Sequence, residues 1–379
     1  MAAAPTRARI AHCPAAVTQM TPESSRRLRA LDNVLVGAHS AMKASASPSK
    51  LRGFVDIQVN GYQGISFTDP SLTLDDCCNC CRSYLAASGC AAFCPTVVTA
   101  SDATYRHCLP VVAAACMLPE FKGRLLGIHL EGPFIATGGG LGAHPVDCVR
   151  SPDPVYFDEL QTFAKGRVVL LTLSAEADGA SRLTRHVVAR GVKVALGHHM
   201  ATAESIAACT EAGATLLTHL GNGVQTSLDR HHNPIIAGLA QDGLSASLIT
   251  DSFHLPPDLI KVALRAKGLD RCIVVSDIGA MAGCEPGDYT KHGELLRLEA
   301  SGKMWMPDRG VLAGSASHML QCCNHLHSLG LLSLEELWQL IFTNPLALLG
   351  IDAAVVDVDR GGKGMLRLVY TAAAGFVLL

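Results

Sequence analysis

The sequence predicts an α/β protein whose main domain is a (β/α)8 TIM barrel. From Gly53 onward, short apolar runs of strand length alternate with helical patterns, which is typical of βαβ units and a parallel sheet. Eight such runs occur, and eight parallel strands close this kind of barrel. The chain has 379 residues. A typical barrel needs roughly 250, so about a hundred residues remain for ends and insertions.

The bounds of the predicted elements come from local sequence signals. One predicted helix ends before Gly213, and another begins at a pair of prolines and ends before Gly268. The predicted helices include 203–212, 257–267, 315–329 and 334–342. The predicted strands are 54–60, 91–98, 125–131, 168–173, 192–198, 215–219, 246–251 and 272–277.

Three segments depart from this alternation. Residues 1–52 are rich in Ala, Ser and Arg and show little periodicity, so we expect a poorly ordered tail or the remnant of a small domain. Residues 282–312 carry several glycines and prolines and predict an insertion, such as a β-hairpin that could act as a lid. Residues 351–379 contain short apolar runs compatible with strands that pair outside the barrel domain, 53–350.

Composition narrows the class of protein. Hydrophobic residues make up 49% of the chain and charged residues 17%, which indicates a large buried core. A net charge of −2 gives no electrostatic reason to expect a nucleic acid or an anionic membrane surface as a partner. No apolar stretch approaches the ~20 residues of a membrane span. Nucleic acids and membranes are therefore disfavoured as partners.

The 15 cysteines are an odd number in a long chain. This favours a reduced cytoplasmic protein over a disulfide scaffold. The run Cys77, Cys78, Cys80 and Cys81 has C-x-x-C spacing, so a zinc or iron–sulfur site is one interpretation. The run continues as an apolar helical pattern, and the favoured interpretation is a helix that buries its thiols as small apolar side chains.

Chemically active side chains stand at the ends of several predicted strands. Glu131, His198 and His219 end the third, fifth and sixth strands. The active site of such a barrel lies at the carboxyl ends of its strands. Two imidazoles and one carboxylate form a ligand set known from catalytic zinc sites, with a coordination position left for water. The sequence therefore predicts a catalytic metal site at the mouth of the barrel.

The alternation of side chains along a strand predicts which residues face inward. His198 should share a face with Val194 and Leu196, and Glu131 should share a face with His129. We expect each ligand to end an inward-facing row.

Two further residues have competing interpretations. Asp277 ends the eighth predicted strand and is the candidate general base and acid, although an aspartate after a strand can also cap a turn. His199 points away from its neighbour His198, and we interpret it as a structural, hydrogen-bonded histidine.

Eight motifs occur in the order found in the N-acetylglucosamine-6-phosphate deacetylases of the amidohydrolase superfamily, and together they resemble that family from about residue 53 to residue 350. They are 53–61 (GFVDIQVNG), 129–134 (HLEGPF), 197–202 (GHHMAT), 212–222 (AGATLLTHLGN), 249–254 (ITDSFH), 274–277 (VVSD), 311–315 (VLAGS) and 343–350 (TNPLALLG).

The resemblance implies that Glu131, His198 and His219 bind one divalent metal and that Asp277 is the catalytic acid/base. Zinc is the expected ion, and iron, manganese and cobalt accept the same donors. The family's reaction is hydrolysis of an N-acetyl group to acetate and an amino-sugar phosphate, and a homodimer is expected. The family also has a small β-domain built from both chain ends, which is barely visible before Gly53, so we expect either a diverged segment or an incomplete domain. The resemblance implies substrate contacts from Ala143, His144, Asn222, Gly223, His254, Leu312, Ala313 and Gly314.

Some positions differ from the pattern of the family or superfamily. Gln58 and Asn60 replace a His-x-His pair common in amidohydrolases, and amides are poor transition-metal ligands, which favours a single metal. His232 stands where many members carry an arginine that reaches the substrate phosphate, while Arg230 lies nearby. Ser252 replaces a usual glycine. A variant sugar therefore remains open as substrate.

Two other functions remain open from the sequence. The same metal and aspartate could serve an amidohydrolase or deaminase that acts on another N-acyl sugar or a ring amide. The barrel could also be a catalytically silent scaffold.

Overall fold

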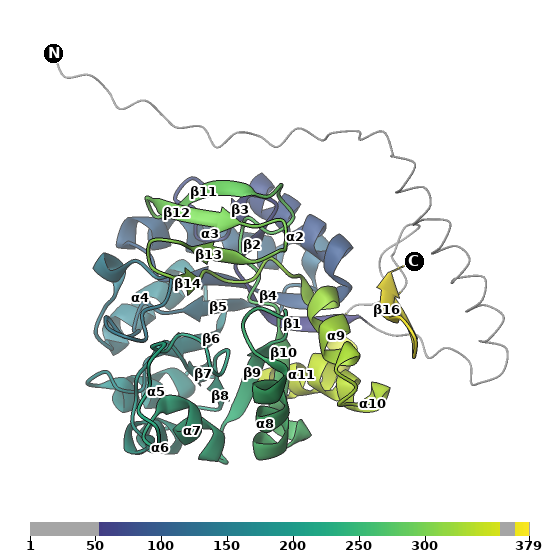
Figure 1. The fold of residues 1–379 in the computed structure, drawn as a ribbon. Helices are drawn as coiled ribbons and strands as arrows, with labels where there is room; N and C mark the ends of the chain where they lie inside the picture. The colour runs from purple at the N-terminus through teal and green to yellow at the C-terminus, as the bar shows by residue number, and fades with distance from the viewer. Residues whose placement is uncertain (1–52, 357–367, 379) are drawn as a thin grey trace. The chain divides into compact units, whose positions relative to one another are not determined.

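The computed structural model describes residues 53–356 and 368–378. It confirms the predicted barrel: eight strands form one sheet, and consecutive strands pair in parallel (Figure 1). Val59 beside Ile278 forms a parallel bridge that brings the first strand to the last. The strands are β1 (Phe54–Val59), β4 (Cys90–Val98), β5 (Ile128–Glu131), β6 (Val168–Leu173), β7 (Lys193–Leu196), β8 (Leu216–Leu217), β9 (Ser245–Ile249) and β10 (Cys272–Val275).

Helices surround the barrel. They are α2 (Leu74–Ser88), α3 (Asp102–Met117), α4 (Pro154–Phe163), α5 (Ala180–Val188), α6 (Ala203–Glu211), α7 (Pro234–Ala240), α8 (Pro257–Lys267), α9 (Met319–Ser328), α10 (Leu334–Trp338) and α11 (Asn344–Leu349), with a π-helical turn at Gln339–Thr343. Short 3-10 turns lie at Pro119–Phe121, Val146–Cys148, Leu269–Arg271 and Ala353–Val355.

The helix expected from residue 315 begins later, at Met319. Ser315 accounts for the difference because it extends the edge of the barrel: its N–H donates to the Asp277 carbonyl, and its own carbonyl accepts from Gly279. The helix expected over 334–342 is divided between α10 and the π-helical turn.

Two apolar clusters separate the inside of the barrel from its outer layer. The inner cluster includes Ile57, Leu170 and Ile273 and is covered at one end by side chains from the α11 region, such as Leu346. The larger outer cluster lies between the strands and the helices. A strand residue in the inner cluster therefore points into the barrel, and a strand residue in the outer cluster points toward the helices.

The cysteine run lies on α2, and the helix interpretation is confirmed. Thr73 caps this helix through a capping box with Asp76. Its thiols Cys77, Cys78, Cys80 and Cys81 are buried in the outer apolar cluster. They pack there as small apolar groups.

Smaller sheets lie outside the barrel. The predicted insertion 282–312 contains a four-stranded antiparallel sheet, larger than the single hairpin expected. Another antiparallel pair near the carboxyl end rests on α9, where Asn324 bonds the backbone of Phe376. The additional strands are β2 (Gly61–Tyr62), β3 (Ile65–Ser66), β11 (Gly287–Lys291), β12 (Glu294–Leu298), β13 (Met304–Met306), β14 (Val311–Leu312), β15 (Leu368–Thr371) and β16 (Gly375–Leu378).

The prediction for residues 1–52 falls outside the described residues, so the proposed small domain from both chain ends stays a prediction. Within the described part of the chain, no helix is both long and apolar enough to cross a bilayer.

Candidate active site

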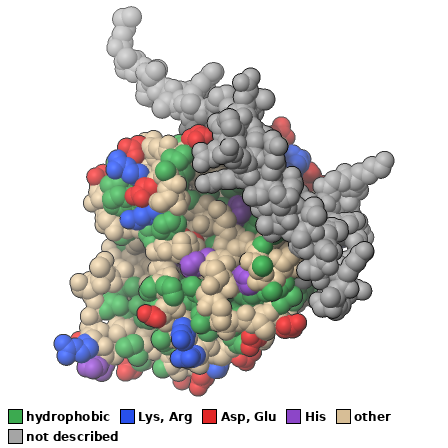
Figure 2. Space-filling view, turned by 45° about the vertical axis from the view of Figure 1, so that its right-hand side comes forward, with side chains coloured by type: hydrophobic (Ala, Val, Ile, Leu, Met, Phe, Trp, Pro, Cys, Tyr) green, Lys and Arg blue, Asp and Glu red, His purple; other side chains and the backbone are tan. Residues whose placement is uncertain are grey.

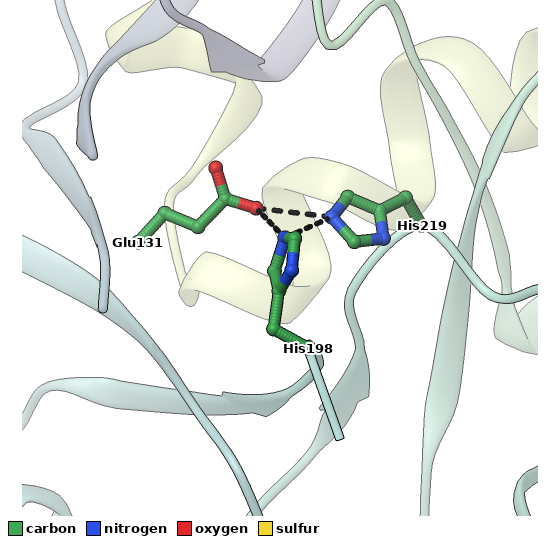
Figure 3. A group of neighbouring side chains, drawn as sticks. All are labelled: Glu131, His198 and His219. Atoms are coloured by element: carbon green, nitrogen blue, oxygen red, sulfur yellow. Dashed lines mark hydrogen bonds and ion pairs between the residues drawn. The ribbon is translucent and has the colours of Figure 1, made fainter. Parts of the chain in front are cut away.

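Glu131, His198 and His219 converge in the structure (Figure 3). The Glu131 Oε1 atom lies 3.2 Å from Nε2 of His198 and 3.0 Å from Nε2 of His219. The two imidazole nitrogens are 3.1 Å apart. All three side chains are buried. Among the described residues, this is the one group of three or more His, Cys, Asp or Glu side chains close enough to share a metal ion.

The donors fit a catalytic metal. Metal–nitrogen and metal–oxygen bonds of about 2.0–2.2 Å place neighbouring ligand atoms roughly 3 to 3.5 Å apart in a tetrahedral site. His198 Nδ1 lies 2.9 Å from the Gly140 carbonyl oxygen, so Nδ1 carries the proton and Nε2 is left with a lone pair. Burial would raise the pKa of Glu131, but the neighbouring imidazoles of His198 and His219 hold it well below its usual value. The carboxylate is therefore available as an anionic ligand.

The sequence predicted that strand alternation alone turns Glu131 and His198 into the barrel. This is correct for Glu131 and wrong for His198. His129 bonds Thr172 within the barrel, and Glu131 follows two residues later on the same face. On β7, however, Val194 and Leu196 belong to the outer cluster and Ala195 to the inner one. Simple alternation would turn His198 outward.

The backbone turns the ligands inward after their strands have ended. β7 ends at Leu196 and β8 at Leu217, before either histidine. His198 has φ 51°, His219 has φ 32° and Asp277 has φ 48°. Such left-handed conformations are uncommon for residues with a Cβ atom, and they cluster at active sites.

Two glycines make room for this arrangement. A Cβ atom on Gly197 would lie 2.7 Å from the Cβ of Thr218, so only glycine fits at this inward position. Gly223 has φ 62°, and a Cβ there would lie 3.0 Å from Nδ1 of His198. Gly197 thus lets its strand end pack against Thr218, and Gly223 lets its loop approach the ligand His198 closely.

Asp277 is joined to the ligand Glu131 by Gln58 of β1, and Asn60, the residue after that strand, also binds Asp277. Gln58 Nε2 donates to Glu131 Oε1 at 2.9 Å and to Asp277 Oδ1 at 3.0 Å. Asn60 Nδ2 donates to the same Asp277 oxygen at 2.8 Å. Burial, followed by the charge of Glu131, raises the pKa of Asp277. The two amides thus orient the candidate acid/base.

Sequence reasoning missed a buried carboxylate behind this pair. Asp56 is completely buried and accepts hydrogen bonds from Tyr84 at 2.6 Å and from Ser276 Oγ at 2.5 Å. Its Oδ1 also accepts from the backbone N–H of Gln58. Asp56 therefore connects the strand that carries Gln58 to the residue before Asp277. Its place two residues before Gln58 was the only sequence signal.

Several predicted substrate residues surround the ligands. The Nε2 atom of His144 lies 3.1 Å from that of His198, and burial holds the pKa of His144 well below its usual value. Asn222 donates from Nδ2 to the His219 carbonyl at 3.2 Å. The Nδ1 atom of His254 lies 2.8 Å from Asp251 Oδ2, and the His254 charge acts on Asp277.

The Leu312–Gly314 turn reaches the site from the small sheet. Ala313 is buried in the apolar cluster of that sheet, where Ala143 packs against it. A Cβ on Gly314 would lie 2.9 Å from the Asp277 carbonyl oxygen, which places the turn beside the candidate acid/base. In the view of Figure 2, several histidine side chains are visible near the middle of the surface.

His232 and His199 lie apart from the ligand group. His232 is exposed, and its backbone N–H donates to Asp229. The structure does not bring it to the ligands of its own chain. His199 is buried and its Nδ1 accepts from the N–H of Ala201, which agrees with a structural role.

A parallel barrel with two histidines, a glutamate and an aspartate at its carboxyl mouth defines a metal-dependent hydrolase. No protein-family model matches the sequence. The N-acetylglucosamine-6-phosphate deacetylase of Rattus norvegicus is 30% identical over 322 residues, which cover 82% of this chain and 76% of that protein. The chain belongs to the N-acetylglucosamine-6-phosphate deacetylase family.

Two other similar proteins bear on the substrate. The N-acetylgalactosamine-6-phosphate deacetylase of Escherichia coli O157:H7 is 27% identical over 310 residues, which cover 82% of this chain and 80% of that protein. A solved N-acetyl-D-glucosamine-6-phosphate deacetylase variant from Mycobacterium smegmatis, in complex with N-acetyl-D-glucosamine-6-phosphate, aligns with a TM-score of 0.77 at 25% identity and covers 89% of each chain.

Proposed function

We propose that this protein hydrolyses the N-acetyl group of N-acetylglucosamine 6-phosphate to give glucosamine 6-phosphate and acetate. The observation that carries the proposal is the convergence of Glu131, His198 and His219 within 3.0 to 3.2 Å of one another, with Asp277 tied to them through Gln58. Membership of the deacetylase family supports the substrate.

Each residue has a distinct task in this reaction. Glu131, His198 and His219 hold one divalent metal, which when bound acidifies water and polarises the acetyl carbonyl. Asp277 takes a proton from the attacking water and returns it to the departing nitrogen. Gln58 and Asn60 both bind Oδ1 of Asp277, and among the described residues no donor binds Oδ2. We therefore assign the proton transfer to Oδ2.

The raised pKa of Asp277 suits this role. Burial and the negative charge of Glu131 both favour the protonated form of Asp277 over its form in water. A carboxyl group with a raised pKa is a better base for water than an ordinary carboxylate, and its acid form can protonate the amine.

The remaining residues bind the sugar in this proposal. His144 and His254 hydrogen-bond substrate oxygens, and the other contacts come from Ala143, Asn222, Gly223, Leu312, Ala313 and Gly314. His232 would add a contact only across the interface of a dimer. Zinc is the proposed metal, because two imidazoles and a carboxylate suit it. The proposal includes a homodimer in the cytoplasm, and the described cysteines, which form no disulfide, are consistent with a reducing compartment.

Acetate release from N-acetylglucosamine 6-phosphate, measured with and without a chelator, tests the proposal. Chelator-sensitive release that returns when zinc is restored is the expected result. N-acetylgalactosamine 6-phosphate and a ring amide should be assayed in parallel. Faster turnover of either compound would reassign the substrate. No turnover of any of them by the metal-loaded protein would favour a silent scaffold.

A further inference from the structure

Lys291 lies in the inserted sheet, beside the hairpin turn that joins β11 to β12. It is the last residue of β11, in which Tyr289 and Lys291 are half-buried and the intervening Thr290 is exposed. Tyr289 packs on the apolar cluster that also holds Ala313 and contacts Ala143. Because alternate residues of a strand share a face, Lys291 lies on the side of the sheet that is turned toward the substrate loops.

The tip of this hairpin is fixed to the site. Lys291 pairs with Glu294 across a two-residue turn, His292–Gly293, in which both residues have positive φ as a type I′ turn requires. Glu294 forms an ion pair with Arg309. Arg309 in turn donates from Nη1 to the His144 carbonyl at 2.9 Å. The loop that carries His144 thus holds the hairpin in place.

The charge of Lys291 is left available. Arg309, the neighbouring cation, is already neutralised by Glu294. Among the described residues, no carboxylate oxygen lies within ion-pair distance of Lys291, although Asp277 and Glu131 both act on it electrostatically. A half-buried cation without an ion-pair partner, within the field of the two active-site carboxylates, is suited to an anion brought by the substrate.

His232 is the other candidate of this chain for contact with the phosphate, and it lies apart from the metal ligands. His232 is exposed, and its backbone N–H donates to the exposed carboxylate of Asp229. Histidine is a weaker and pH-dependent partner for a phosphate dianion than lysine. Lysine is a common phosphate ligand; burial lowers the pKa of Lys291, and the charges of Asp277 and Glu131 act in the opposite direction and favour its charged form.

We propose that Lys291 binds the 6-phosphate of the substrate and so sets the preference for phosphorylated over unphosphorylated amino sugars. This proposal rests on the proposed deacetylase function, because it names the group that recognises one end of that substrate. It assigns Lys291 to binding and leaves proton transfer to Asp277.

Binding of the product provides a test that does not depend on turnover. The affinity of the zinc-loaded protein for glucosamine 6-phosphate and for glucosamine is measured by calorimetry in the wild type and in Lys291→Met, which keeps the apolar stem and removes the charge. The expected result is a loss of ~10- to 100-fold in affinity for the phosphate ester and no change for glucosamine. Lys291→Arg should retain most of the affinity.

Lys303 offers a matched control on the same sheet. Its ammonium lies 4.5 Å from the ring centre of Trp305. Lys303→Met should bind both sugars as the wild type does. In the kinetic assay, Lys291→Met should raise KM for N-acetylglucosamine 6-phosphate and leave kcat within about threefold, as expected when uniform binding is lost.

Three outcomes would overturn the assignment. They are an unchanged affinity of Lys291→Met for glucosamine 6-phosphate, an equal loss for both sugars, and a wild type that does not distinguish the two sugars. Failure of the deacetylase proposal looks different, because it would leave the protein without acetate release whatever Lys291 does.

Discussion

The reacting end and the anion-binding end of the site are built from different parts of the chain. Glu131, His198 and His219 come from the barrel itself, and hydrogen bonds within the barrel fix them. Lys291 comes from an inserted hairpin and makes no ion pair within the described residues. The barrel therefore holds its chemistry rigidly, whereas substrate preference can change through an inserted segment without disturbing the ligands.

The largest expected effect is at the reacting end. Glu131→Ala removes the anionic ligand and leaves two buried imidazoles, so the protein should lose its metal and all measurable acetate release. Metal content per chain, measured after gel filtration, checks this. Undiminished occupancy would exclude Glu131 as a principal ligand and would remove the contrast between the two ends.

Asp277→Asn should have the next largest effect. The amide keeps the size of the side chain but cannot carry the proton, so kcat should fall by ~10²- to 10⁴-fold while metal content stays near that of the wild type. Steady-state kinetics together with metal analysis separate the two effects. Equal turnover in the variant would refute the acid/base role.

Asp56, which lies behind the reacting end, should affect how the free energy of unfolding depends on pH. Burial raises the pKa of Asp56 to about 6 from a usual value near 4, against the hydrogen bonds from Ser276 and Tyr84. Between these values the folded protein holds a proton that the unfolded chain has lost. The stabilisation from Asp56 is therefore present below pH about 4 and is lost as the pH rises through about 6.

Asp56→Asn should remove this pH dependence, which amounts to at most about 3 kcal/mol. Urea unfolding of both proteins at several pH values from 4 to 7 measures it. Asp251 does not obscure this change. Bonds from His254 hold the pKa of Asp251 at about 2, against the effect of burial, so its stabilising effect is lost only as the pH falls toward 2, and this happens equally in both proteins. Parallel stability curves for variant and wild type would contradict the prediction.

The smallest expected effect is that of His232→Ala. His232 is exposed and lies apart from the ligands of its own chain, so we expect KM for the phosphorylated substrate to rise less than about threefold, well below the change in Lys291→Met. A larger effect than that of Lys291→Met would place phosphate recognition on His232 instead, reached from the second subunit of a dimer.

The sequence allowed the barrel and the metal ligands to be predicted because both depend on short local signals. Apolar runs identified each strand, and histidines or acids that follow such runs identified the mouth of the barrel. The inward rotation of His198 could not be predicted, because strict alternation points the adjacent Gly197 inward and a left-handed turn after the strand reverses the result.

Contacts between distant segments were also beyond local reasoning. Gln58 and Asn60 were recognised as poor metal ligands, but their role as donors to Asp277 depends on β1 lying beside β10. Lys291 resembled any polar residue before a tight turn. Its position depends on Arg309 joining the hairpin to the His144 loop.

The thiols buried in the two apolar clusters have a practical consequence for following the protein in solution. Of the described cysteines, only Cys148 and Cys284 are half-buried, and burial raises the pKa of interior thiols such as Cys80 and Cys94. A thiol-reactive dye should therefore label the native enzyme slowly at these interior positions and the denatured chain rapidly. The rate of interior labelling therefore reports how often the apolar core opens to solvent.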